Sequence, residues 1–305
     1  MFTYAPRPNR KSSPLLPLLV LVFWLGLLCW TKPAYGFHFK DYAPSPHLTP
    51  PDAIYARAVV LEDADTGEVL YARNPDMRLL PASTTKLMTA LIVYEKLGGF
   101  NGSVRIEEGD RAEPSNIPVV PGETISVDTL FHALLIESAN DSARALGRAV
   151  AGSNEAFVQM MNERALAMGC FNTHFYNPNG LPAPSGTHFT SCADLMRIFR
   201  AVLKYPELVK ILSTKEYRIQ TASGVHTLLN HNRLLGYYPG MGPAKTGWTE
   251  ASKHTYACAV TQGGHTLLLT LLDSTNKWKD AQILFNWGFT QVASGQPALS
   301  GTAQR

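Results

Sequence analysis

The stretch PASTTKLMTALIVYEKL, residues 81–97, predicts a helix that starts at a serine and a lysine. Ser83 stands where a helix N-cap is expected, and apolar residues follow it at helical spacing. Ser83 and Lys86 are three residues apart, so we expect both side chains on one face of the first turn. A serine becomes a nucleophile beside a base, and a lysine is a base only when burial or a second cation lowers its pKa. Taken alone, a capping serine beside a solvated lysine is the commoner interpretation of this spacing.

A second motif, Ser138-Ala139-Asn140, lies where a loop is expected to meet helices. Ser138 can pass a proton to a leaving amine, and Asn140 can hydrogen-bond the backbone of a peptide substrate. Taken alone, Ser-x-Asn commonly caps a helix.

A third motif, Lys245-Thr246-Gly247, precedes a strand expected over residues 255–260. Lys245 and Thr246 suit the binding of a carboxylate, and Lys245 is a candidate for the second cation beside Lys86. Gly247 lets a substrate backbone approach closely. Taken alone, Lys-Thr-Gly is equally typical of a turn.

The order of the three motifs is more specific than any one of them. Together they supply a nucleophile, a proton shuttle and a cationic clamp for an anion, which is a complete acyl-transfer site. This ordered set is typical of class A β-lactamases and penicillin-binding proteins.

Over about residues 52–290, the chain resembles the D-alanyl-D-alanine carboxypeptidase family, the low-molecular-mass penicillin-binding proteins. The segments around Ser83 and Ser138 match the family closely. Further matching segments are residues 59–70, 172–175, 177–181, 188–190 and 287–289, and residues Asn230, Asn232, Leu234 and Leu235.

The resemblance implies an α/β fold, with a mostly antiparallel sheet flanked by helices and a helical subdomain on one side of the cleft. It implies these site residues: catalytic Ser83, Lys86 and Ser138, and substrate-binding Asn140, Lys245, Thr246, Gly247 and Trp248. The backbone N–H groups of Ser83 and Trp248 would hold the oxyanion. The implied partners are peptidoglycan stem peptides as substrates and β-lactams as covalent inhibitors, with no cofactor.

Two positions depart from the family pattern. Trp248 stands where the family commonly has histidine, and a bulky indole there can change which substrates enter. His231 stands between Asn230 and Asn232, with Arg233 beside the pair, where the family often has a small polar or basic residue. We therefore expect carboxylate recognition to differ.

Three alternative functions compete with the carboxypeptidase. Single-domain relatives include D,D-endopeptidases, which cut peptidoglycan cross-links with the same catalytic residues. A class A β-lactamase needs a glutamate-bearing loop for deacylation, but Glu163 lies in an expected helix and residues 172–181 contain no acid. A protein that only binds cell-wall peptide would be expected to lack a motif residue, and none is missing.

The N-terminal segment has the pattern of a secretory signal peptide. Three basic residues precede an apolar run over residues 15–30, and Ala34-Tyr35-Gly36 suits cleavage after Gly36. An uncleaved membrane anchor is the alternative. We expect a signal peptide over residues 1–36, a Pro-rich linker over 37–52, a catalytic domain over 53–290 and a disordered tail over 291–305. Export to the periplasm or cell envelope follows.

Composition excludes several other classes. Residues 1–36 carry four basic and no acidic residues, so the rest of the chain has 23 basic and 24 acidic residues, and no basic stripe predicts nucleic-acid binding. Three cysteines, Cys170, Cys192 and Cys258, follow the expected signal peptide. A Cys170–Cys192 disulfide and buried free thiols are both consistent with the sequence, and we favour the free thiols. The scattered histidines predict no metal site.

Periodicity and turn signals predict strands on both sides of a turn at residues 65–67, and more strands near the C-terminal end. Helices are expected at residues 83–97, 127–137, 141–151, 154–168, 192–204 and 280–288, and later strands at 216–220, 255–262 and 265–272.

Overall fold

The computed structural model describes residue 51 and residues 53–294. The predicted signal peptide, the predicted linker apart from Pro51, and residues 295–305 lie outside the described residues. Within the described part of the chain, no helix combines the length and the apolar character needed to cross a membrane.

The centre of the fold is a five-stranded antiparallel sheet in the order β2-β1-β9-β8-β7. These strands are β1 (Ala58–Asp63), β2 (Val69–Arg73), β7 (Met241–Thr249), β8 (Lys253–Gln262) and β9 (His265–Ser274). The first hairpin closes where Asp63 accepts hydrogen bonds from the backbone of Asp65 and Thr66, as the Asp-Thr-Gly signal predicts. The predicted fold class is confirmed.

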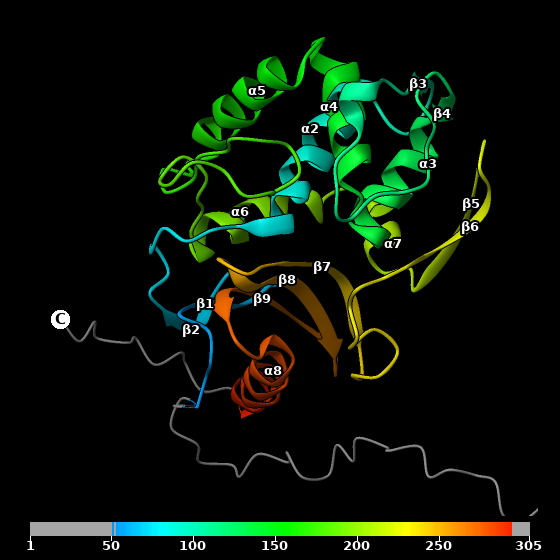
Figure 1. Cartoon of the computed structure of the whole chain (residues 1–305). Coiled ribbons are helices and arrows are strands. Elements are labelled where there is room, and N and C mark those ends of the chain that lie inside the picture. The colour runs from blue at the N-terminus through cyan, green and yellow to red at the C-terminus, as the bar shows by residue number, and fades with distance from the viewer. Residues whose placement is uncertain (1–50, 52, 295–305) are drawn as a thin grey trace, which may run out of the picture. The chain divides into compact units, whose positions relative to one another are not determined.

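Helices cover both faces of this sheet (Figure 1). The C-terminal helix α8 (Lys277–Ser294) packs on one face, and α6 (Cys192–Val202) packs on the other. Along β9, Leu267 and Leu269 belong to the α8 side, and Leu268 belongs to the other side. Burial of both faces explains why the central strands are almost continuously apolar.

A helical region lies beyond the α6 face (Figure 1). Its helices are α2 (Lys86–Leu97), α3 (Val127–His132), α4 (Asn140–Ala151), α5 (Asn154–Ala167) and α7 (Pro206–Leu212), with a π-helix at Ala133–Glu137 and 3₁₀ turns at Ala82–Thr85 and Glu108–Asp110. Two small hairpins pair β3 (Ser103–Arg105) with β4 (Thr124–Ser126), and β5 (Glu216–Thr221) with β6 (Gly224–Leu229). The buried face of α2 packs against α4 and α6, which places the start of α2 between this region and the sheet.

The predicted end of the last helix was wrong. Gly288 suggested a helix end, but α8 continues to Ser294, so residues 291–294 are helical and not part of a disordered tail. A Cβ at Gly288 would lie 2.8 Å from side-chain atoms of both Leu61 and Leu267. This glycine therefore lets the middle of the helix approach the sheet.

Strand β7 was also missed, together with α7, β3, β4 and β6. The Lys-Thr-Gly motif lies within β7, not in a turn before a strand. Because β7 is an edge strand of the sheet, it tolerates Pro243 and two glycines that resemble loop residues in the sequence.

The three cysteines of the described chain are free and buried, as favoured from the sequence. Burial raises the pKa of the Cys170 thiol to about 12.

Candidate active site

Ser83 lies in a 3₁₀ turn, not at the predicted N-cap position, and α2 begins only at Lys86. The turn is anchored at Pro81, whose carbonyl accepts hydrogen bonds from Thr84 Oγ1 at 2.6 Å and Thr255 Oγ1 at 2.8 Å. Ala82 has a positive φ of 46°, which is uncommon for a residue with a side chain. The sheet and the turn therefore fix the position of Ser83 jointly.

Lys86 is completely buried beside the serine. Its Nζ lies 3.0 Å from Ser83 Oγ, 2.7 Å from Asn140 Oδ1 and 2.6 Å from the carbonyl oxygen of Asn179. Burial first, and then the charge of Lys245, hold the pKa of Lys86 well below its ordinary value, while Asp141 opposes this shift. A neutral amine has two N–H groups and one lone pair. The two carbonyls can accept both N–H groups, and the lone pair is then left facing the serine hydroxyl.

The loop over residues 177–181 forms one wall around Lys86. Asn177 Oδ1 accepts hydrogen bonds from the backbone of Asn179 and Gly180, so its side chain shapes the loop. Gly180 has a φ of 83°, and a Cβ there would come within 1.9 Å of the carbonyl oxygen of Ala82. The glycine thus permits the contact that brings the Asn179 carbonyl to Lys86.

Asp141 is the buried acid closest in sequence to the second motif, and it accepts hydrogen bonds from the backbone of Ile117 and Ser142. Burial raises its pKa to about 6, against the opposing effects of these hydrogen bonds and of Lys86.

Ser138 and Lys245 form a second pair. Ser138 ends the π-helix with a positive φ of 65°, and its Oγ accepts a hydrogen bond from Lys245 Nζ at 2.9 Å. Lys245 is 2% exposed. Burial first, and then the charge of Lys277, lower its pKa to about 7, while Glu137 opposes the shift. The two buried lysines therefore do not both need to carry a full charge near neutral pH.

Gly247 brings β7 against the 3₁₀ turn that contains Ser83. A Cβ at this position would lie 2.3 Å from Thr255 Oγ1 and 2.8 Å from the backbone nitrogen of Ser83. The next residue, Trp248, is 59% exposed and lines the cleft. This contact places the backbone of β7 beside the backbone N–H of Ser83, as an oxyanion-binding arrangement requires.

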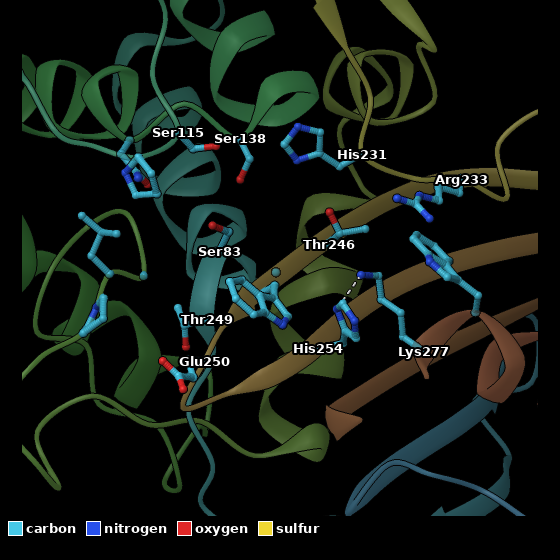
Figure 2. A pocket seen from close by; sticks show the side chains of 18 of the residues that line it. Ser83, Ser115, Ser138, His231, Arg233, Thr246, Thr249, Glu250, His254 and Lys277 are labelled. Carbon is cyan, nitrogen blue, oxygen red and sulfur yellow. Dashed lines mark hydrogen bonds between the residues drawn. The ribbon is translucent and has the colours of Figure 1, made fainter. Parts of the chain in front are cut away.

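The three motifs meet in an open cleft of about 940 Å³ (Figure 2). Of the eight predicted site residues, six line it directly: Ser83, Ser138, Asn140, Thr246, Gly247 and Trp248. The two lysines lie buried behind these residues. His231 also lines the cleft, and its Nε2 lies 3.5 Å from Glu137 Oε1.

The position of Lys277 in the cleft was not anticipated from the sequence. Lys277 Nζ lies 2.9 Å from His254 Nδ1 and 4.4 Å from the centre of the Trp278 ring. Burial first, and then the charge of Arg233, lower the pKa of Lys277 to about 8. Arg233, His254 and the adjacent pair Lys277 and Trp278 come from three separate segments, and nothing in the spacing of these segments marks them as neighbours.

Within residues 53–294, no group of three or more His, Cys, Asp or Glu side chains is arranged to hold a metal ion.

A serine beside a buried lysine, with two further motifs converging on it in this fold, defines the serine-type acyl-transfer enzymes. The chain belongs to the D-alanyl-D-alanine carboxypeptidase family, peptidase S11, whose family pattern matches residues 45–276. The resemblance inferred from the sequence is thereby confirmed.

Relatives and solved structures agree with this assignment. The chain is 34% identical to the D-alanyl-D-alanine carboxypeptidase DacF of Bacillus subtilis, over 90% of this chain and 71% of the relative. It is 32% identical to DacB2 of Mycobacterium tuberculosis, over 82% of this chain and 87% of the relative. A crystal structure of a D-alanyl-D-alanine carboxypeptidase from Mycobacterium tuberculosis superposes with a TM-score of 0.74 at 31% identity, covering 81% of this chain and 95% of that chain.

Two other similar proteins bear on the alternatives. A D-alanyl-D-alanine endopeptidase of Pseudomonas aeruginosa is 30% identical, over 80% of each chain. Penicillin-binding protein D2 of Listeria monocytogenes, solved in its ampicillin-bound form, has a TM-score of 0.70 at 27% identity, covering 79% of this chain and 100% of that chain.

Proposed function

We propose that this chain is a serine-type D-Ala-D-Ala carboxypeptidase, which removes the terminal D-alanine of peptidoglycan stem pentapeptides through an acyl-enzyme on Ser83. The observation that carries the proposal is the position of Lys86 Nζ, 3.0 Å from Ser83 Oγ in a fully buried environment. Burial of this kind lowers the pKa of a lysine and favours the neutral amine, which can accept the serine proton.

In the acylation step, Lys86 takes the proton of Ser83 as Oγ attacks the carbonyl carbon of the penultimate D-alanine. The negative charge that forms on the carbonyl oxygen is stabilised by the backbone N–H groups of Ser83 and Trp248. The C–N bond then breaks, and Ser138 gives its proton to the departing amine. Lys245, which donates to Ser138 Oγ, can replace that proton.

Substrate binding uses the third motif and Asn140. Lys245 and Thr246 bind the terminal carboxylate, and Asn140 hydrogen-bonds the peptide backbone. Asn140 also accepts from Lys86, so the residue that holds the substrate orients the base as well. In the deacylation step, water attacks the ester, the Ser83 oxygen leaves as a hydroxyl, and the shortened peptide is released. A β-lactam acylates the same serine and is released slowly.

The endopeptidase remains the second candidate, because a relative with this name matches most of the chain. The cross-linked substrate of an endopeptidase has the same kind of scissile bond as a pentapeptide and differs only in the groups attached beyond that bond. The site described above therefore serves both reactions. The β-lactamase alternative is weaker, since Glu163 lies on the exposed side of α5 and hydrogen-bonds Gln159.

Action on peptidoglycan requires export. We propose that residues 1–36 act as a cleaved signal peptide that delivers residues 37–305 to the periplasm or cell envelope. A membrane attachment follows only if this segment is retained. N-terminal sequencing of the secreted protein tests the proposal: a chain that starts at Phe37 supports it, and a chain that keeps residues 1–36 contradicts it.

The activity is tested by mass spectrometry of muropeptides from isolated peptidoglycan that contains pentapeptide ends and cross-linked dimers. We expect the chain from Phe37 onward to shorten pentapeptides by one alanine and leave dimers intact. A Ser83→Ala protein is the matched control and should leave both unchanged. Dimers split to monomers would identify an endopeptidase, and products that do not depend on Ser83 would contradict the proposed mechanism.

A further inference from the structure

Charge is divided between the two sides of the cleft. Arg233 and Lys277 lie on one side of Ser83, and Glu250 lies on the other side, next to Thr249 (Figure 2). Among the described residues that line the cleft, Glu250 is the one carboxylate. A substrate with a negative end and a positive group along its chain therefore fits the cleft in one direction.

Glu250 is presented by a rigid turn between β7 and β8. The Thr249 N–H donates to Ser252 Oγ at 2.9 Å, and the Ser252 N–H donates back to Thr249 Oγ1 at 3.0 Å. Ser252 is buried under the turn, whereas Glu250 is exposed. Across residues 53–294, no hydrogen bond or ion pair engages the Glu250 carboxylate. The turn thus holds a carboxylate at the cleft that is available to a ligand.

The direction of β7 relates Glu250 to the substrate, an argument that rests on the proposed function. A peptide whose terminal carboxylate lies at Thr246 and whose scissile carbonyl faces the Trp248 N–H runs antiparallel to β7. Extended chains advance about 3.3 Å per residue. The residue before the two D-alanines therefore lies beside Thr249 and Glu250.

We propose that Glu250 binds the side-chain ammonium of a diamino-acid residue that precedes the D-Ala-D-Ala pair. The enzyme then selects acyl donors whose side-chain amine is free over donors in which this amine is blocked. An ion pair at an exposed carboxylate has a modest effect, so we expect a preference of about three- to fivefold in kcat/KM. The preference should weaken as salt is added, because exposed charges are screened.

The test compares two tripeptides, Nα-acetyl-L-lysyl-D-Ala-D-Ala and the same peptide with its side-chain amine acetylated, by release of D-alanine. We expect the wild-type chain to prefer the free amine and Glu250→Gln to cleave both peptides equally. Glu155→Gln is the matched control, since Glu155 is an exposed glutamate on α5 away from the cleft, and it should keep the wild-type preference.

A charge reversal provides an independent readout. Glu250→Lys should favour a peptide whose side-chain amine carries a succinyl group, which ends in a carboxylate. The inference is overturned if the wild-type chain cleaves both peptides equally, or if Glu250→Gln retains the preference, while D-alanine is still released. If the wild-type chain releases D-alanine from neither peptide, the proposed function itself fails.

Discussion

The close approach of β7 to the 3₁₀ turn that contains Ser83 makes Gly247→Ala a sensitive test of the site. The added Cβ would lie 2.8 Å from the Ser83 nitrogen and 2.3 Å from Thr255 Oγ1, so it is about 0.6 Å and about 1.1 Å inside ordinary contact. Thr255 cannot move freely, because its hydroxyl donates to the Pro81 carbonyl at 2.8 Å. The strand or the turn must therefore shift by a large fraction of an ångström.

A misplacement of about 1 Å in a catalytic site can lower the rate about 10²-fold. We expect Gly247→Ala to slow acylation by a fluorescent β-lactam by about 10²-fold, measured as the second-order rate constant. Gly242→Ala is the control, because a Cβ at Gly242 on the same strand lies at an ordinary 3.5 Å from the nearest atom. If Gly247→Ala is acylated within about twofold of the Gly242→Ala rate, the close contact at Gly247 does not control the position of Ser83.

Three further predictions follow from the same geometry. Lys86→Met should lower the acylation rate by about 10²–10⁴-fold, because it removes the proposed base beside Ser83. Stopped-flow acylation at near-wild-type speed would contradict this role. Lys245 has a folded pKa of about 7 against an ordinary 10.5, so between these pH values the unfolded chain keeps a proton that the folded chain has released. The free energy of unfolding should therefore rise with pH in this window. Urea unfolding at two pH values should show a smaller rise for Lys245→Met than for the wild-type chain. An equal rise in both proteins would show that the pKa of Lys245 is not lowered. Thr255→Val should lower the stability by about 1 kcal/mol and also slow acylation, because it removes the hydrogen bond to the Pro81 carbonyl. If thermal unfolding and acylation are both unchanged, this hydrogen bond does not help to position Ser83.

The sequence predicts well where local signals and the final packing agree. Ser153 and Ser191 each cap a helix, with Oγ accepting from Ala156 N–H and Asp194 N–H, and both helices start where expected. The helix end predicted at Gly288 was wrong because this glycine is required by tertiary packing. It allows Leu61 and Leu267 to pack closely against α8. A glycine that ends a helix and one that allows close packing look alike in a sequence.

The same distinction between local signals and tertiary packing applies to the site. The motifs identify Ser83 and Lys86, but Lys86 also donates a hydrogen bond to the Asn179 backbone carbonyl, 93 positions away along the chain, which no side-chain pattern marks. The positive φ of Ser138 and the partnership of Lys277 with His254 depend on how distant segments meet. The residues of short motifs can therefore be predicted from the sequence, whereas the buried environment that shifts their pKa values cannot.

The proposed acyl-enzyme on Ser83 can be detected by intact-mass spectrometry after incubation with benzylpenicillin, followed by peptide mapping. We expect one adduct of the mass of the antibiotic, located on the peptide that contains Ser83, and none in Ser83→Ala. An adduct that persists in Ser83→Ala, or that maps to another residue, would show that Ser83 is not the acylated residue.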